Sequence, residues 1–555
     1  MGTNTAQKLP PVSSDQDSSS QNSIEIIKNR QSKELILAFC GPIGSGIKAI
    51  RLAFENNLEN LGYKVHHIHI SSLMDKVKKT SVNTDPYNRY IEKQNQGNAL
   101  RENYGPQIMA LRLWPSDYGP QIMALRLWPS DYGPQIMAEA AIASIAEIKQ
   151  KSRTSINAEA RFNEKFVYII DQLKNPAEVE LLRLVYQHNF YLIGVVRNES
   201  ERKRNLRDEG ISPQHIDELI HLDRKSGGSK GQQVEKTILD ADFFIRNNQS
   251  HSTQLNNKVE RFLGLIHGKN GLTPSLHEKG MFNAFSASLQ SACLSRQVGA
   301  AIVDHEGNIL STGRNDVPRP GGGLYTFEDE NKDFRCIHKG GKCYNDMHKA
   351  KIKDSITKQI NLSLDNVLTQ SSSKPLLEKA IRSIFVDTDF VEKLASNIYS
   401  NSPIKSLIEY SRAIHAEMDA ITTLACTGEA STKNKIMFTT TYPCHNCARH
   451  IVAAGIVSVY YIEPYEKSLA LDLHDDAIND TNINDTQKVN FIQFEGVSPR
   501  RYAKFFFTTS DRKNSQGYAY PYATKYSNHV DYQFIDSYQE MEDKITQIYT
   551  SKISD

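Results

Sequence analysis

The sequence has little that would tie it to a membrane, to an oxidising compartment or to a nucleic-acid polymer. Its apolar runs are far shorter than the roughly 20 residues of a membrane-spanning helix, so no membrane segment is expected. It has 7 cysteines in 555 residues, and with no signal peptide expected we interpret this as a reducing, cytoplasmic setting. Its 66 basic and 64 acidic residues nearly cancel, so any contact with nucleic acid must rest on a local patch.

The few cysteines include a pair in an informative context. Cys444 and Cys447 stand in Pro-Cys-His-Asn-Cys, downstream of His415-Ala416-Glu417. At the start of a helix, two residues three apart share one face, where backbone N–H groups favour the thiolate form. His415 opens an apolar run, residues 416–425, that predicts a second helix. The pattern therefore offers one imidazole, two thiolates and a spare carboxylate.

This set of side chains suits Zn²⁺ held with one open position. His415, Cys444 and Cys447 would be the three protein ligands, and water in the open position would have its pKa lowered to about 7 from about 15.7. Glu417 would then move protons between that water and a substrate. The alternative is a structural zinc knuckle, but such a site fills its fourth position with another Cys or His and has no use for Glu417.

The full pattern, H-x-E followed by P-C-x-x-C, resembles the signature of the zinc-dependent nucleoside and nucleotide deaminases. Upstream, residues 286–304 predict a helix that runs through a tight turn into a buried strand, and residues 309–312 a second strand. This succession is similar to the deoxycytidylate deaminases. The resemblance implies that Asn315 bonds the sugar of the nucleotide, whereas a turn Asn before Pro318 is the alternative. Tyr442 would line the base pocket or belong to the core.

A long insertion, residues 330–410, separates Asn315 from His415 and departs from the compact deaminase pattern. It holds a cluster of candidate zinc ligands, namely Cys336, His338, Cys343 and His348. Two thiols and two imidazoles this close are compatible with a second, closed structural zinc site. The spacing is not a stock finger pattern, and free thiols in a reduced protein are the alternative.

The first half of the chain predicts a different kind of domain. Residues 34–40 read as a buried strand and lead into a glycine-rich loop and a helix, the context of a phosphate-binding loop. Its candidate nucleotide-binding residues are Gly41, Gly44, Ser45, Gly46 and Lys48. Ile47 separates Gly46 from the lysine, and Ala49 stands where a Walker A motif has Ser or Thr. The missing hydroxyl removes the usual Mg²⁺ ligand, which argues against phosphoryl transfer.

Later segments favour a nucleoside-monophosphate-kinase-like fold. Residues 166–171 predict a strand that ends in Asp171, placed like a Walker B acid, and further strands are expected at residues 191–196 and 241–245. Arginines that resemble the lid arginines of small kinases follow the middle strand, at Arg197, Arg202, Arg204 and Arg207. A solvated helix is the alternative explanation of this run.

The fold class predicted from these patterns is α/β. A P-loop kinase-like domain with a parallel sheet is expected at residues 33–265 and a cytidine-deaminase-like αβα domain at residues 275–555. Residues 1–32, rich in Ser, Gln and Asp, are expected to be a disordered lead-in. Residues 104–117 recur identically as residues 118–131, and we interpret residues 104–131 as a duplicated insertion at the surface without a catalytic role.

The combination of the two domains resembles the bacterial antiviral cytidine-nucleotide deaminases. The resemblance implies zinc-dependent deamination of dCMP and dCTP, which depletes the nucleotide pool that a phage needs, and restraint by a small RNA. It also implies a homo-oligomer, and it makes the P-loop half a regulatory or nucleotide-sensing domain. Two other classes remain open, a nucleic-acid base deaminase and a nucleotide-binding toxin or scaffold in which the P-loop half dominates.

Overall fold

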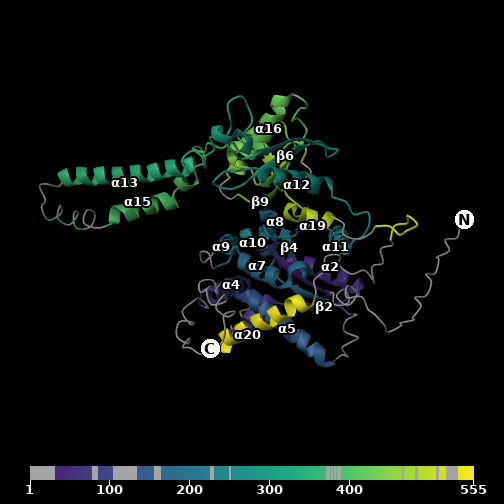
Figure 1. Cartoon of the computed structure of the whole chain (residues 1–555). Coiled ribbons are helices and arrows are strands. Elements are labelled where there is room, and N and C mark those ends of the chain that lie inside the picture. Colours follow the sequence, from purple (N-terminus) through teal and green to yellow (C-terminus); the bar gives the residue numbers. More distant parts are fainter. Residues whose placement is uncertain are drawn as a thin grey trace.

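A computed structural model provides the fold of the chain (Figure 1). It describes residues 32–77, 85–103, 134–155, 164–224, 231–248, 252–370, 389–465, 468–481, 485–507, 512–520 and 535–554, together with the single residues 376, 379 and 383. The duplicated segment 104–131 and nearly all of the predicted lead-in lie outside the described residues. No helix in the described part of the chain is long and apolar enough to cross a membrane.

The first part of the chain, called the N-terminal module here, is a parallel sheet with helices on both faces. Its elements are β1 (Glu34–Cys40), α2 (Ile47–Asn60), β2 (Tyr63–Ile68), α3 (Ile70–Val77), α4 (Pro86–Asn103), α5 (Ile136–Ser155), β3 (Lys165–Ile170), α7 (Pro176–Tyr186), η3 (Gln187–Asn189), β4 (Phe190–Val196), α8 (Glu199–Asp208), α9 (Pro213–Arg224), α10 (Val234–Ile238), β5 (Phe243–Arg246) and α11 (Ser252–Ile266). The parallel strands lie in the order β5-β4-β1-β3-β2.

The central strand β1 explains why helices cover both faces of this sheet. Leu35, Leu37 and Phe39 pack with residues of α2 and α11 on one face, whereas Ile36 and Ala38 pack with residues of α5 and α7 on the other. All five side chains are fully buried. A strand buried on both faces reads as a continuous apolar run, and this pattern is typical of parallel sheets in α/β proteins.

The second module carries a mixed sheet. Its elements are α12 (Leu276–Ser288), β6 (Gly299–Val303), β7 (Ile309–Arg314), η4 (Phe327–Lys332), α13 (Tyr344–Gln370), α15 (Phe390–Asn401), η6 (Pro403–Ser406), α16 (Ala416–Thr427), β8 (Ile436–Thr441), α17 (His445–Ala453), β9 (Ser458–Glu463), α18 (Ala470–Leu473), β10 (Ile478–Asn479) and β11 (Val489–Gln493). The strand order is β10-β11-β9-β8-β6-β7, antiparallel only around β6. The predicted α/β class, with two sheets rich in parallel pairs, is confirmed.

The insertion forms an arm on this module. Helices α13 and α15 pack against each other and project away from the two sheets (Figure 1). The base of α13 remains close to the second sheet, because Tyr344 and Lys349 line the same cavity as residues of α16. The insertion is therefore part of the surroundings of the candidate active site.

The end of the chain returns to the N-terminal module, which differs from the predicted range 275–555. Strand β12 (Gly496–Val497) pairs antiparallel with β5. After η7 (Pro499–Arg501) and α19 (Tyr502–Phe506), the last helix α20 (Ile535–Ser554) packs on α5 and α7. Figure 1 shows α20 beside α5, and Tyr538 of α20 donates a hydrogen bond to Glu34 of β1. These contacts are long range in sequence, which is why the pattern of residues did not reveal them.

A buried ion cluster fastens α20 to the first sheet, and we expect it to be a main source of stability there. Lys149 on α5 lies 2.6 Å from Glu34 on β1 and 2.6 Å from Glu542 on α20, and its side chain is only 5% exposed. Replacing one partner leaves a buried charge unpaired, so Lys149→Met is expected to lower the free energy of unfolding by about 3–5 kcal/mol.

The control is Lys151→Met on the same helix. Its ion pair with Glu147 is exposed, so the expected loss is about 0.5 kcal/mol or less. Urea denaturation followed by circular dichroism measures both. Equal losses in the two variants would show that the cluster does not fasten the C-terminal helix.

Candidate active site

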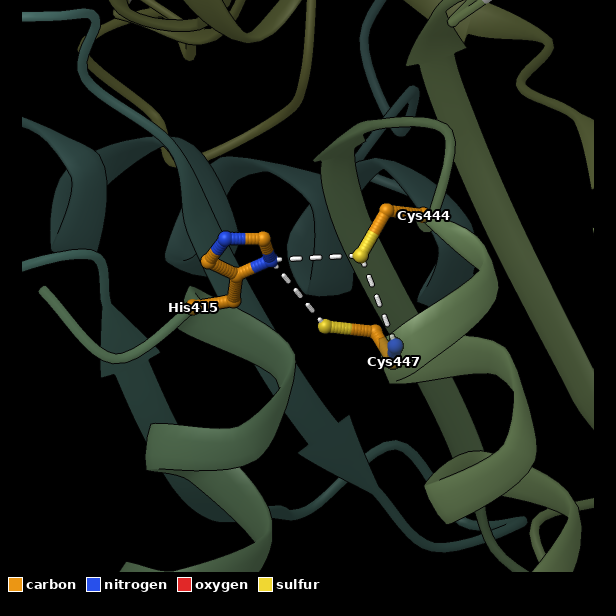
Figure 2. A group of neighbouring side chains, drawn as sticks. All are labelled: His415, Cys444 and Cys447. Carbon is orange, nitrogen blue, oxygen red and sulfur yellow. Dashed lines mark hydrogen bonds between the residues drawn. The ribbon is translucent and has the colours of Figure 1, made fainter. Parts of the chain in front are cut away.

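The three predicted zinc ligands come together between two helix N-termini. His415 is the residue that precedes α16, and Cys444 is the residue that precedes α17. Figure 2 shows the imidazole and both sulfur atoms pointing toward one another. The Nδ1 atom of His415 lies 3.3 Å from the sulfur of Cys444 and 3.4 Å from that of Cys447. Among the described residues, this is the one group of three such side chains whose ligand atoms lie within 4.8 Å of one another.

These distances fit a tetrahedral zinc ion. Bond lengths of about 2.3 Å to sulfur and about 2.0 Å to nitrogen place the nitrogen and sulfur corners of a tetrahedron about 3.5 Å apart. Two thiolates and one imidazole are also the kind of donors that zinc takes when three protein ligands leave a fourth position open. The donor set therefore fits zinc both in chemistry and in spacing.

Local structure explains the thiolate character of Cys444. Its sulfur accepts a hydrogen bond from the backbone N–H of Cys447, as expected for a residue at the start of a helix. Hydrogen bonds from Cys447 and His415 lower the pKa of the Cys444 thiol to about 4. The bond with Cys444 in turn raises the pKa of His415 to about 9. Both shifts favour the thiolate of Cys444, which is the form that binds zinc.

Glu417 lies beside the three ligands, in the first turn of α16. It is 4% exposed, and the Cys447 thiol lies 3.5 Å from its carboxylate. Burial raises the pKa of Glu417, and the neighbouring His415 partly opposes this shift. A buried carboxyl group beside the three ligands is placed to take up and return a proton at the open position of the site.

A cavity of about 250 Å³ opens over these residues and is called the site cavity here. His415, Glu417 and Cys444 line it, and so do Asn315 and Tyr442. The ring of Tyr442 also packs edge-on against the rings of Tyr461 and Phe491, with 4.8 and 5.3 Å between the ring centroids. Tyr442 therefore combines the two environments expected for it, the wall of a pocket and a contact with the core.

Asn315 lines the site cavity, but its amide is already engaged by the backbone. Its oxygen accepts from the N–H of Val298 at 2.7 Å, and its nitrogen donates to the carbonyl of Arg296 at 2.8 Å. These bonds fix the loop before β6. One N–H and one lone pair of the amide remain for a substrate, so sugar binding by Asn315 stays a prediction.

The four candidate ligands of a second zinc do not converge. Cys336 and Cys343 line the site cavity, whereas His338 lies 3.3 Å from Asp333 and His348 stacks on Tyr410. The described residues hold no metal-ligating group that includes any of the four. Sequence spacing did not reveal this, because the two histidines face other partners.

From this arrangement we expect one zinc per chain. Cys336→Ala should keep that content, since its thiol belongs to no ligand group among the described residues, whereas Cys444→Ala should lose it. Zinc is measured by atomic emission on the dialysed protein. A content of two per chain that falls to one in Cys336→Ala would contradict this expectation and restore the second site.

The predicted phosphate loop follows β1 as expected, and glycines are needed where it bends. Gly44 and Gly46 have φ angles of +79° and +77°, which other residues adopt at a cost, and Gly46 precedes α2. Ser45 is 1% exposed, and its hydroxyl has no hydrogen-bond partner among the described residues. Lys48 is exposed. Gly41 packs on β4, where an added Cβ would lie 2.7 Å from the carbonyl oxygen of Val195.

Protein groups already occupy part of this loop. The carboxylate of Asp223 accepts the N–H of Ile43 at 2.7 Å and pairs with Lys174. Asp171 follows β3, as predicted, but it bonds His69 at 3.0 Å and the N–H of Ile70 at 2.9 Å. Burial tends to raise the pKa of Asp171, but hydrogen bonds, chiefly from His67 and His69, hold it well below its usual range. An acid engaged in this way differs from a free Mg²⁺ ligand.

The structure also brings residues into the site cavity that the sequence did not single out. Lys349 and Arg412 come from the insertion and its end, and Arg296 from the turn before β6. Asp316 supports the same turn by accepting the N–H of Ala292 at 3.0 Å. Because Asp316 directly follows the predicted site residue Asn315, the sequence could have indicated that it lies near the site. Nothing in the spacing of the insertion indicated that Lys349 would face the cavity.

Comparisons with known proteins agree with this geometry. Residues 274–463 match the model of the cytidine and deoxycytidylate deaminase zinc-binding region. A stretch of 190 residues is 28% identical to the deoxycytidylate deaminase of Enterobacteria phage T4, which covers 33% of this chain and 76% of that protein. A stretch of 55 residues is 44% identical to ComE operon protein 2 of Bacillus subtilis (strain 168), over 10% of this chain and 29% of that protein.

Solved structures also match. The dCMP deaminase from cyanophage S-TIM5 in apo form is 17% identical, covering 40% of this chain and 100% of that one with a TM-score of 0.20. The same enzyme in complex with dCMP and dUMP is 16% identical over 40% and 99%, with a TM-score of 0.21. TT1252 from Thermus thermophilus is 16% identical over 41% and 96%, with a TM-score of 0.19. From the match over residues 274–463, the C-terminal region of this chain carries a deaminase domain of the cytidine and deoxycytidylate type.

Proposed function

We propose that the chain is a zinc-dependent hydrolase that deaminates a free cytosine deoxynucleotide, dCMP or dCTP, to the uracil deoxynucleotide. One observation carries the proposal. The ligand atoms of His415, Cys444 and Cys447 converge beside the buried Glu417, and a cavity opens over them. A structural zinc site would have its fourth ligand there and no opening.

The residues have distinct roles in the proposed reaction. Zinc, when bound by His415, Cys444 and Cys447, supplies the Lewis acidity that makes water a nucleophile near neutral pH. Glu417 takes a proton from the attacking water and delivers it to the ring nitrogen beside the attacked carbon. It then assists the departure of ammonia. Tyr442 and Asn315 bound the cavity on the sides of the base and the sugar.

A cationic rim supports a substrate that carries phosphate. Arg296, Lys349 and Arg412 line the same cavity as Glu417. Arg412 is held in place by a bond to the carbonyl of Phe334 at 2.9 Å. Bonds from ammonium or guanidinium groups to phosphate are among the stronger hydrogen bonds in proteins, and we propose that Lys349 and Arg412 bind the phosphate of the nucleotide.

Lys349→Met is expected to raise KM for dCMP about fivefold to tenfold with little change in kcat, because it removes binding that is equal in ground and transition states. The control is Lys351→Met, two residues along the same helix and exposed. Steady-state kinetics on both variants measures the effect. An unchanged KM in Lys349→Met, or an equal rise in both, would show that this rim does not hold the phosphate.

A panel of substrates tests the proposed function itself. The purified chain is incubated with dCMP, dCTP, CMP and single-stranded DNA, and ammonia release is followed. Turnover is expected on the deoxynucleotides. Turnover confined to single-stranded DNA would instead identify a nucleic-acid base deaminase, and no turnover on any of them would favour a nucleotide-binding toxin or scaffold.

We propose further that the N-terminal module is a kinase-like P-loop domain with a regulatory rather than a phosphoryl-transferring role. Two observations support this proposal. The carboxylate of Asp223 on α9 already accepts the N–H of Ile43 in the glycine-rich loop, and Asp171 is already bonded by His67 and His69. Depletion of nucleotides in phage defence, restraint by a small RNA, assembly into a homo-oligomer and a cytoplasmic location stay predictions from the sequence.

A further inference from the structure

A second cavity of about 300 Å³ lies at the junction of the two modules and is called the junction cavity here. One wall belongs to the N-terminal module and includes Pro42 of the glycine-rich loop together with Arg197 and Arg202. The other wall belongs to the deaminase domain and includes Tyr461 and Tyr465. Figure 1 shows β4 and α8 of the first wall close to β9 of the second.

The first wall is equipped to receive an anion. The guanidinium of Arg197 reaches over the glycine-rich loop, where it would lie 3.3 Å from a Cβ added at Gly46. Its Nε atom is buried and has no hydrogen-bond partner among the described residues. Arg202 is 7% exposed, and its Nε donates to the carbonyl of Ile43 in the loop. A buried N–H without an acceptor is costly, so an acceptor from a ligand would be favourable here.

The acidic residues of this wall have protein partners. Glu199 and Glu235 both lie near Arg224, at 3.4 and 3.0 Å, and Asp223 bonds Lys174 and the N–H of Ile43. These three acids of the first wall are therefore paired within the protein. Arg197 contacts Glu201 only at 3.4 Å, which leaves it the best placed cation for a ligand.

The second wall is aromatic and carries its own unused polar atom. Tyr442, Tyr461 and Tyr465 line the junction cavity, and such rings accept bases by stacking. The side-chain oxygen of Gln493, on the same wall, is buried without a hydrogen-bond partner among the described residues. Arginines on one wall and tyrosine rings on the other point to a ligand with a phosphate end and a base end.

We propose that the junction cavity binds a nucleoside triphosphate, with the phosphates at Arg197 and Arg202 and the base against the tyrosines and Gln493. The site differs from the deaminase active site and draws on both modules. Its placement gives the N-terminal module a way to act on the reaction, because Tyr442 and Tyr465 line the site cavity as well as the junction cavity. A ligand that orders this shared wall changes the pocket in which the cytosine nucleotide reacts.

Binding is tested first, by isothermal titration calorimetry of the full chain with ATP, GTP, UTP and tripolyphosphate. None of these ligands contains cytosine. At least one nucleotide is expected to bind more tightly than tripolyphosphate, and Arg197→Met is expected to weaken its binding about tenfold or more. Arg204→Met is the matched control, because Arg204 also pairs with Glu201 but is half exposed and does not line the cavity. It should bind as the unmodified chain does.

Gln493→Leu alters the opposite wall and should weaken binding severalfold. Thermal unfolding of each variant shows whether it folds. If Arg197→Met does not fold, the binding measured for Gln493→Leu decides the proposal. Equal binding by Gln493→Leu would place the nucleotide on the glycine-rich loop alone and overturn the proposal. It is also overturned if no nucleotide binds, if Arg197→Met and Arg204→Met bind alike, or if tripolyphosphate binds as tightly as the nucleotides.

The effect of the bound nucleotide on deamination is measured separately, as kcat/KM for dCMP, and this part of the proposal rests on the proposed function. Saturating the junction cavity should change kcat/KM for dCMP about fivefold or more, and Arg197→Met should reduce that response at the same nucleotide concentration. Binding without any change in kcat/KM would contradict the link. A chain that deaminates nothing but still binds nucleotide at Arg197 and Gln493 would refute the proposed function and leave the binding site standing.

Discussion

Glu417→Gln is expected to lower kcat for deamination by about 10²- to 10⁴-fold while the zinc content stays at that of the unmodified chain. The amide has nearly the same shape as the carboxylate but does not accept and return a proton, and proton transfer of this kind contributes about that factor. Glu417 is buried beside the three ligands without being one of them, so the substitution leaves all three ligands in place.

Glu429→Gln is the matched control, because Glu429 is exposed just beyond the same helix. It should have full activity. A Glu417→Gln variant that retains zinc and turns over dCMP within a few fold of the unmodified chain would rule out Glu417 as the proton carrier. The measurement is steady-state ammonia release on protein whose zinc content has been determined.

Cys444→Ala is expected to lose both zinc and detectable deamination. With one thiolate removed, two protein ligands remain, and zinc sites of this type are built from three or more. Cys444 also accepts the bond that begins α17, so some loss of stability is expected, and Cys444→Ser keeps an acceptor at that position. Both variants should contain no zinc and show no turnover. The unfolding temperature of Cys444→Ser should be closer to that of the unmodified chain than the unfolding temperature of Cys444→Ala.

Cys426→Ala controls for the loss of a thiol as such, since Cys426 is exposed on α16. It should keep one zinc and full turnover. If Cys444→Ala keeps its zinc after dialysis, or deaminates dCMP without it, the three residues are not the metal site. Zinc content and ammonia release on the same samples give the answer.

Several elements could be predicted from the sequence because local pattern determines them. The strand expected at residues 34–40 has these same bounds in the structure, since an uninterrupted apolar run ends at a glycine-rich loop. The helix that begins after His415 and the helix that begins after Cys444 are also present. Their positions relative to the pair of cysteines bring the three ligands together, so the motif contained the geometry of the candidate site.

Other features depend on contacts between distant residues, which a local pattern does not encode. Helix α20 packs on α5 almost 400 residues earlier in the chain, as the bond between Lys149 and Glu542 shows. The histidines of the insertion, His338 and His348, have partners other than a metal. Lys349 lines the site cavity because the first turns of α13 lie beside that cavity, and its position in a long polar helix gave no signal of this.

The most direct test of the account is the reaction of the zinc-loaded chain with dCMP. Ammonia and dUMP should be released in equal amounts by protein that holds one zinc, and removal of the metal with a chelator should abolish the reaction. If folded, zinc-loaded protein releases no ammonia from dCMP or dCTP, the proposal that this chain is a cytosine deoxynucleotide deaminase is wrong.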